Sequence, residues 1–377
     1  LVETLSEKMQ RSTSMAPTSY ITALRFPLAL LVVLIHTQNK IWQAAEAQDS
    51  LWFSVPVHFL SRSLPAVAVP LFFAISGFLF FYQKQTFTLA DQREKLRKRC
   101  VTLLLPYIVW NLLAFLLAPL KTLLQGGDWK TLLLNFSPLD VFWGSLSTET
   151  SVNLWGMSVW ASSHPQLEPL WFVRDLMVIV LFAPLLHFLL RRVPVLFLLG
   201  LSMAGLLQLW VKPWGMTMAG WFYFSLGAFF SVRNLCPIET TRCLLRPALF
   251  VAAVTLGWNT LPEDLVLVQT DLLPSGMSYH LYNLSAMVVL LHAAQAYTRR
   301  RAPHPWLSKS SFFVYASHAI VLFPVTVMLH RLTLGQPPLV ALAAFIGSAV
   351  VAVAVCLVGY RVLQRVLPKF VSRALGI

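Results

Sequence analysis

The sequence predicts an all-α polytopic membrane protein, a bundle of about ten transmembrane helices with both termini in the cytoplasm. Three observations predict this class. The composition is 57% hydrophobic and only 12% charged, the mean hydropathy is +0.67, and basic residues gather in alternate segments between apolar stretches. Soluble globular domains carry roughly twice this share of charged residues.

Each predicted span is an apolar stretch with few charges, because a helix needs about 20 apolar residues to cross a bilayer. The stretch at 247–259 is short for a span. The predicted spans are 21–38, 64–82, 102–124, 169–190, 194–211, 214–232, 247–259, 276–297, 310–330 and 338–362.

The net charge of +14 does not indicate a nucleic-acid partner, because the charges follow the predicted topology. With the N-terminus inside, the cytoplasmic segments receive most of the lysines and arginines, and the outer segments receive more acids than bases. This distribution is typical of multi-pass membrane proteins. We interpret most basic clusters as topology determinants that also contact anionic lipids. The clusters lie at 93–99, 191–192, 299–301 and 361–373.

One membrane domain over 20–365 is expected, between a polar tail at 1–19 and a short basic tail at 366–377. The longest outer segment, 125–168, carries four tryptophans, and a loop of this length is usually functional. Its aromatic side chains suit two roles, stacking on sugars or forming an interfacial belt. The sequence leaves both open.

The first span contains Arg25 and His36, and ionisable residues within a span indicate function by default. Eleven residues are close to three helical turns, so both share one face about 16 Å apart. We therefore expect a buried cation near one membrane surface and a buried titratable base near the other. This arrangement suits a ligand with an anionic head and a reactive end.

The second and third spans add polar residues near the cytoplasmic side. Ser76 and Gly77 lie inside the second span, where small residues allow either close helix packing or access of a ligand to the backbone. Lys98 and Arg99 end the basic run before the third span. Their side chains can bind the phosphates of a cytoplasmic cofactor.

Arg174 and Asp175 are adjacent in the outer half of the fourth span, at about the depth of His36. Neighbouring residues on a helix point about 100° apart, so we expect each to reach other partners. Asp175 can orient His36 or raise its basicity, and Arg174 can hold a developing oxyanion or an acidic acceptor. The alternative is a buried ion pair that fixes the helix register.

The ninth span carries Tyr315 and His318, which are three residues apart and share a helix face. His318 lies about two turns into the membrane from the inner side. It suits either a site facing the bundle interior or a core histidine whose polar atoms are satisfied by neighbours.

These segments are similar, in the same order and over essentially the whole chain, to the bacterial acyltransferase 3 family of integral-membrane acyltransferases. The resemblance rests on Arg25 with His36, on 69–79, on 98–111, on 170–176 and on 311–318. One position departs from it. Many members carry a second arginine three residues after the one that matches Arg99, where this chain has Thr102. Arg97 or Arg93 is the expected substitute.

The resemblance implies transfer of an acyl group, most often acetyl, from cytoplasmic acyl-CoA to a hydroxyl of a cell-surface glycan or its lipid-linked precursor. It implies the bacterial inner membrane as the location. The expected partners are acetyl-CoA as co-substrate, the glycan acceptor and membrane lipids. Neither a metal nor nucleic acid is expected, and a homo-oligomer is left open.

The roles of the site residues follow from this resemblance. The expected catalytic residues are His36, as general base or covalent acyl carrier, with Asp175 and Arg174. The expected acyl-CoA-binding residues are Arg25, Lys98, Arg99, Ser76, Tyr315 and His318.

Two other classes of protein share this composition. One is a transporter or exporter of a lipid-linked or small polar substrate, with the buried His, Arg and Asp as a proton relay. The other is a non-catalytic membrane scaffold or sensor, in which His36 has no chemical role.

Overall fold

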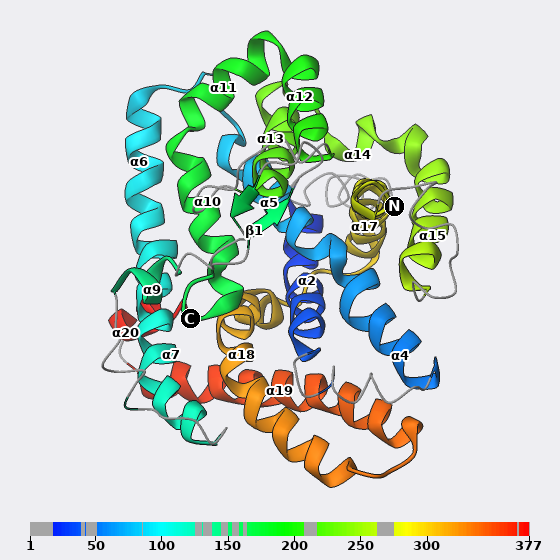
Figure 1. Ribbon diagram of the computed structural model, residues 1–377. Coiled ribbons are helices and arrows are strands. Elements are labelled where there is room, and N and C mark those ends of the chain that lie inside the picture. Colours follow the sequence, from blue (N-terminus) through cyan, green and yellow to red (C-terminus); the bar gives the residue numbers. More distant parts are fainter. Residues whose placement is uncertain are drawn as a thin grey trace, which may run out of the picture.

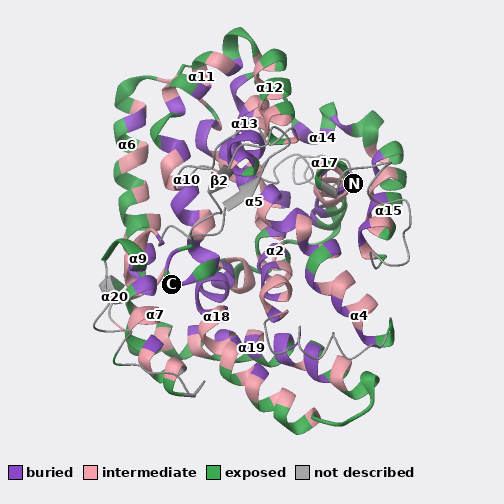
Figure 2. Cartoon of the chain, in the orientation of Figure 1, coloured by how far each residue is buried: buried purple, intermediate pink, exposed green. Residues whose placement is uncertain are grey.

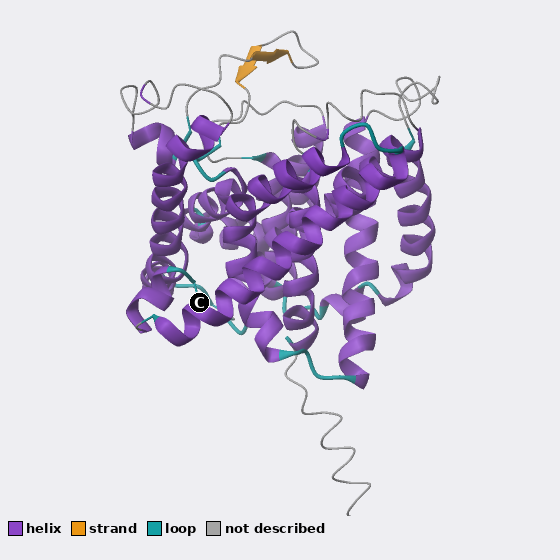
Figure 3. Ribbon diagram, turned by 90° about the horizontal axis from the view of Figure 1, so that it is seen from below, coloured by secondary structure: helices purple, strands orange, loops and turns teal. Residues whose placement is uncertain are grey.

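The computed structural model describes residues 18–38, 42, 51–84, 86–124, 130, 138–144, 150–152, 158–160, 164–206, 217–261, 275–367 and 369–376. These residues form a helical bundle, which confirms the all-α prediction (Figure 1). One short antiparallel hairpin of β1 (Thr150–Val152) and β2 (Ser158–Trp160) lies at one end of the bundle, and the C-terminus lies toward the opposite end (Figure 3). The polar N-terminal tail at 1–19 falls almost entirely outside the described residues.

Most of the longer helices lie in the predicted apolar stretches, whereas α4 and α6 lie outside them. Their bounds are α2 Ser19–Thr37, α4 Leu51–His58, α5 Ala68–Phe81, α6 Leu89–Arg99, α7 Leu105–Leu124, α10 Trp171–Leu181, α11 Ala183–Arg192, α12 Pro194–Leu206, α13 Met218–Val232, α15 Leu245–Thr260, α17 Ser275–Arg300, α18 Pro305–Thr333 and α19 Pro338–Val366. Shorter elements connect them, namely η1 Phe59–Ser63, η2 Leu64–Val67, η3 Cys100–Leu104, α9 Pro138–Phe142, η4 Glu168–Leu170, α14 Pro237–Thr240, η5 Arg242–Leu244 and α20 Lys369–Ala374.

A helix lies in each of the ten predicted ranges, but the count of about ten spans is not confirmed. Among the described residues, six helices are long and apolar enough to cross a membrane, or seven if the bent pair α10–α11 is one span. Helices α12 and α13 are shorter apolar helices, and α17 carries many polar residues. The six spans support a multi-pass membrane protein.

The buried side chains gather on the helices at the centre of the bundle, while α6, α15 and α19 expose long outer faces (Figure 2). Helix α2 lies in this centre and contacts α5, α17 and α18. Exposed leucine and valine side chains on the outer helices are expected where lipid replaces water as the solvent. The burial pattern therefore places α2 where it can hold a site.

Helices α5 and α13 approach each other closely because two glycines face the partner backbone. A Cβ atom added at Gly77 would lie 2.0 Å from the carbonyl oxygen of Phe224, and one added at Gly227 would lie 1.8 Å from that of Ala74. Both distances are far below van der Waals contact, so only glycine allows this packing. Of the two roles left open for Gly77, close helix packing matches this geometry.

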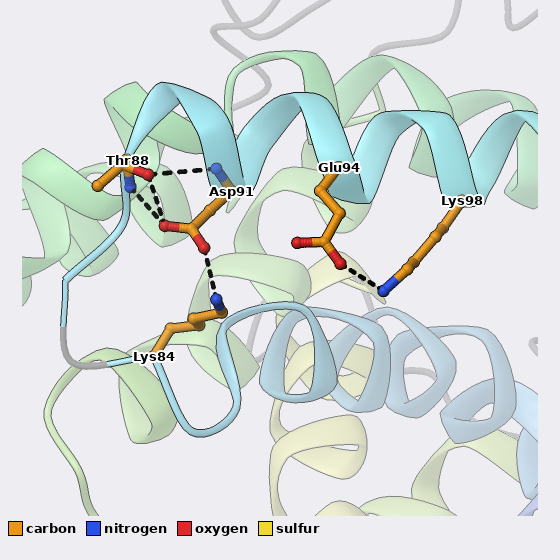
Figure 4. A network of polar contacts seen from close by, with 5 residues as sticks. All are labelled: Lys84, Thr88, Asp91, Glu94 and Lys98. Atoms are coloured by element: carbon orange, nitrogen blue, oxygen red, sulfur yellow. Dashed lines mark hydrogen bonds and ion pairs between the residues drawn. The ribbon is translucent and has the colours of Figure 1, made fainter.

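Helix α6 begins with a capping box (Figure 4). The Thr88 hydroxyl accepts a hydrogen bond from the Asp91 backbone N–H at 3.2 Å, and the Asp91 carboxylate accepts one from the Thr88 N–H at 2.9 Å. Asp91 also accepts from Lys84 at 2.5 Å, and this hydrogen bond raises the pKa of the Lys84 ammonium. These contacts fix the start of α6, whose last turn carries the basic residues.

The pair α10–α11 bends by 67° at Phe182. Pro184 stands in the first turn of α11, and proline supplies no backbone N–H to continue a helical ladder. The bend directs the N-terminal half, which carries Arg174 and Asp175, toward the bundle centre, where both are buried.

The C-terminal tail is more ordered than the sequence predicts. Residues 369–374 form helix α20, which packs against α7 and η3. Ala374 is buried, and the indole N–H of Trp110 donates to the Leu375 carbonyl at 3.2 Å. Gly376 lies against the ring of Phe312. The basic residues of this stretch are expected only as a short cytoplasmic tail, and its docking depends on a few tertiary contacts that the sequence does not predict.

We expect Gly227→Ala to destabilise the protein because its methyl group would overlap the Ala74 carbonyl. Overpacking typically costs about 1–3 kcal/mol, and backbone cannot move aside as a side chain can. Thermal unfolding of the purified protein in detergent measures the loss. The matched control is Gly257→Ala, where nothing lies within 4 Å of the added Cβ and alanine is the better helix former. Equal unfolding temperatures for both variants would contradict the packing described.

Candidate active site

A cavity of about 800 Å³ lies beside the first half of α2. It brings together four residues expected to bind one ligand, Arg25 from α2, Ser76 from α5, Arg99 from α6 and Tyr315 from α18. Phe72, Phe172 and Phe312 form much of its apolar wall. We call it the arginine cavity.

The two predicted arginines differ in their surroundings. Arg25 is exposed, which corrects the expectation of a buried side chain, and its exposed surface faces the open arginine cavity. Arg99 is half-buried, with its guanidinium 5.0 Å from the centre of the Phe80 ring. Within the described part of the chain, neither arginine forms an ion pair. Both charges therefore remain available to an anionic ligand.

Thr102 lies on η3, a π-helical segment between α6 and α7. Segments of this kind occur frequently at functional sites. Thr102 and its neighbours Val101 and Leu103 line the arginine cavity. The Thr102 hydroxyl donates to the Lys98 carbonyl at 3.1 Å, one turn earlier in the chain. Its hydrogen atom is therefore used within the helix. The position at which the resemblance implies an arginine thus lies at the cavity but supplies no charge.

Lys98 does not join this cavity. Its ammonium donates to Glu94 at 2.5 Å on the outer face of α6, where the Lys98 side chain is 71% exposed (Figure 4). Arg97 and Arg93, the expected substitutes for the missing arginine, are also exposed and do not line the cavity. The expectation that Lys98 contacts the ligand therefore has no support in the geometry.

The cavity also contains a third arginine that the sequence does not predict there. Arg373 from α20 lines the arginine cavity, together with Gly376. The signal in the sequence was the basic stretch at the C-terminus, which we interpreted as a topology determinant. Only the docking of α20 against α7 and η3 reveals that this stretch lies beside Arg25 and Arg99.

A second cavity, of about 430 Å³, lies at the other end of α2. It is lined by His36, by Gln166 and Glu168 before α10, and by apolar residues of α7 and α18. We call it the histidine cavity. Gln166 and Glu168 are exposed and offer hydrogen-bonding groups close to the imidazole. His36 itself is half-buried rather than fully buried as expected.

A single contact forms part of the wall between the two cavities. The Tyr315 hydroxyl donates a hydrogen bond to the Pro169 carbonyl. Tyr315 lines the arginine cavity, while Pro169 lines the histidine cavity. Phe172 packs edge-on against the Tyr315 ring at 6.2 Å. Tyr315 therefore lies at the cavity where it is expected, and its hydroxyl bonds to a residue that lines the histidine cavity.

His318 lies with His36 instead of in the arginine cavity. The two imidazole rings are 5.3 Å apart between centroids. His318 is fully buried, and its Nδ1 is 2.7 Å from the Tyr315 carbonyl oxygen. His318 does not line the arginine cavity with the other residues expected to bind acyl-CoA, because its side chain lies beside His36.

Arg174 and Asp175 pair with each other, contrary to expectation. Two guanidinium nitrogens of Arg174 donate to Asp175 Oδ1, at 3.1 and 3.0 Å, and a third donates to the Trp143 carbonyl at 2.5 Å. Asp175 Oδ2 accepts from the Thr217 backbone N–H at 3.3 Å. Both side chains are buried. This geometry matches the alternative reading, a buried ion pair that fixes the helix register. His36 is not among the partners described for Asp175.

One family model matches this chain. The family model of the acyltransferase domain matches residues 18–361, which is most of the chain. The chain belongs to the acyltransferase 3 family. The succinoglycan biosynthesis protein ExoH of Rhizobium meliloti (strain 1021) is 30% identical over 195 residues, covering 50% of this chain and 47% of that relative. The match thus spans about half the length of ExoH. No solved structure matches the chain.

Membership of this family allows the two cavities to be compared with what an acyl transfer requires. An acyltransferase needs one place for the acyl donor and one for the acceptor, with a base where they meet. This member of the family has an arginine-lined cavity, a histidine-lined cavity and one helix that contributes to both. Among the described residues, no group of three or more His, Cys, Asp or Glu side chains is arranged to hold a metal ion.

We expect Asp175→Leu to lower stability strongly, because it leaves the Arg174 guanidinium buried without its carboxylate. Breaking a buried ion pair on one side typically costs about 3–5 kcal/mol. Asp175→Asn retains an acceptor for Thr217 and should lose less. Thermal unfolding in detergent separates the variants. If Asp175→Leu unfolds at the temperature of the unchanged protein, the pair does not support the fold.

Proposed function

We propose that this acyltransferase is a membrane O-acyltransferase that moves an acyl group, acetyl in the simplest case, from cytoplasmic acyl-CoA to a hydroxyl of a cell-surface glycan or its lipid-linked precursor. The observation that carries the proposal is the pair of cavities joined by α2. One cavity presents arginines and the other presents an imidazole, separated by the Tyr315–Pro169 contact.

The arginine cavity suits the donor. Coenzyme A carries several phosphates, and arginine binds phosphate through paired N–H donors. Arg25, Arg99 and Arg373 offer three such groups around about 800 Å³. The helix rise sets about 16 Å between Arg25 and His36, a distance that an extended pantetheine arm matches. Phosphates held at Arg25 would therefore leave the thioester near His36.

His36 can catalyse the transfer in two ways, as a general base or as a nucleophile. As general base, an imidazole nitrogen takes the acceptor hydroxyl proton while the oxygen attacks the thioester carbon, the carbon–sulfur bond breaks, and the CoA thiolate takes the proton. As nucleophile, the same nitrogen attacks the thioester carbon and CoA leaves as the thiolate. The acceptor hydroxyl then attacks the acyl-imidazole, the carbon–nitrogen bond breaks, and the CoA thiolate takes up the hydroxyl proton. Both routes need His36 unprotonated.

The histidine cavity suits the acceptor. Gln166 and Glu168 line it with hydrogen-bonding groups, which carbohydrate hydroxyls require. The name of the relative ExoH points to polysaccharide biosynthesis, in line with a glycan acceptor. The arginine end would face the cytoplasm of a bacterial inner membrane, since basic residues remain on that side.

Acyl-CoA turnover by the purified protein tests this function. We expect the unchanged protein to release free CoA, and His36→Ala to bind acyl-CoA with unchanged affinity but to lose about 10²–10⁴-fold in turnover. Arg25→Ala should weaken binding about tenfold, equivalent to roughly 1.4 kcal/mol. Lys98→Ala is the matched control, because Lys98 pairs with Glu94 away from the cavity. CoA release and acyl-CoA binding are measured separately.

A folded protein that neither binds nor consumes acyl-CoA would overturn the proposal. Gradient-dependent flux of a substrate that leaves the protein chemically unchanged would then favour a transporter with a proton relay.

We also expect Arg373→Ala to weaken acyl-CoA binding about tenfold, or roughly 1.4 kcal/mol, because Arg373 adds a third cation to the cavity. Lys369→Ala on the same helix is the control, since Lys369 is exposed and does not line the cavity. Equilibrium binding of a labelled acyl-CoA measures both. Equal loss in the two variants would show a general charge effect and would contradict a specific contact.

A further inference from the structure

His318 has a fixed tautomer in this structure. Its Nδ1 lies 2.7 Å from the Tyr315 carbonyl oxygen and 3.3 Å from that of Val314. A carbonyl oxygen only accepts hydrogen bonds, so Nδ1 carries the proton and donates. The other ring nitrogen, Nε2, is therefore an unprotonated acceptor when the ring is neutral.

That acceptor is buried and has no hydrogen-bond partner among the described residues. Buried polar atoms without a partner are rare in proteins, and each one needs an explanation. The nearby hydroxyl of Ser317 does not supply one, because it donates to the Phe313 carbonyl at 2.7 Å. The His318 side chain is fully buried, so bulk water does not reach it.

The His36 ring lies at the right separation to be that partner. The ring centroids are 5.3 Å apart. Two imidazoles joined edge to edge by an N–H···N bond of about 2.9 Å have centroids about 5 Å apart. The rings are tilted by 46°, and the bond requires the His36 ring to turn, next to the histidine cavity that it lines.

We propose that His318 is a positioning residue for His36. Its Nε2 accepts the N–H of His36, which leaves the other His36 nitrogen unprotonated and directed into the histidine cavity. This inference rests on the proposed function only for its effect on turnover. When His36 takes the hydroxyl proton, the bond to His318 stabilises the imidazolium, and that proton then passes to the CoA thiolate. His318 neither gains nor loses a proton.

Two amide variants separate this role from a structural one. In His318→Gln, the side-chain oxygen reaches the position of Nε2 and keeps an acceptor for His36. In His318→Asn, the amide nitrogen takes the position of Nδ1 and keeps the bond to the Tyr315 carbonyl, but no acceptor remains at Nε2. A purely structural role predicts that His318→Asn is the milder change. The positioning role predicts the reverse.

We expect His318→Asn to lower the turnover of acyl-CoA about tenfold or more, as a part of the ~10²–10⁴ that a general base supplies. The acyl-CoA binding constant should stay unchanged, because His318 lies outside the arginine cavity. His318→Gln should stay within about threefold of the unchanged protein, since it retains the acceptor. His292→Gln is the matched control, a half-buried histidine on α17 that bonds to Thr241.

A second readout needs no acyl-CoA. Diethyl pyrocarbonate acylates an unprotonated imidazole nitrogen, and peptide mass spectrometry gives the rate at His36. We expect this rate to fall in His318→Asn and to be retained in His318→Gln. An unchanged rate at His36 in His318→Asn, or an equal loss in both variants, would overturn the proposal. If the unchanged protein releases no CoA, the proposed function fails, and the diethyl pyrocarbonate rates still decide the role of His318.

Discussion

The rise of helix α2 fixes the distance between the two cavities. Arg25 and His36 are eleven residues apart on this helix, so about 16 Å separate them along its axis. That is about half of the ~30 Å hydrocarbon thickness of a bilayer. Contacts with α5, α17 and α18 hold α2 in the centre of the bundle. A ligand held by its charged end at Arg25 must be extended to present a reactive end at His36.

The low polarity of the bundle interior explains the walls around this path. Polar atoms inside a membrane protein must find protein partners. Tyr315 donates to the Pro169 carbonyl, and the Asn111 side chain donates to the Tyr107 carbonyl and accepts from the Leu167 N–H. These bonds join α7, the turn before α10 and α18 around the two cavities. The buried Nε2 of His318 is an exception to this rule, and it lies beside His36.

The sequence predicted the helices and half of the site because both depend on local spacing. Apolar runs mark most of the helices. Arg25 lies within the first run and Arg99 just before the third, and both line one cavity. Tertiary packing decided the rest. Arg373 reaches the cavity only because the chain end docks on α7 and η3. Arg174 pairs with Asp175 because its long side chain folds back, and in a buried site the nearest opposite charge prevails over the direction of Cβ.

The structure of the protein bound to a non-hydrolysable thioether analogue of acetyl-CoA, determined by electron cryomicroscopy, tests the central claim most directly. We expect the phosphates within hydrogen-bond distance of Arg25, Arg99 and Arg373, with the pantetheine arm passing Tyr315 and the acyl carbon beside His36. Phosphates bound at the histidine end, or an analogue that lies outside the arginine cavity, would contradict it.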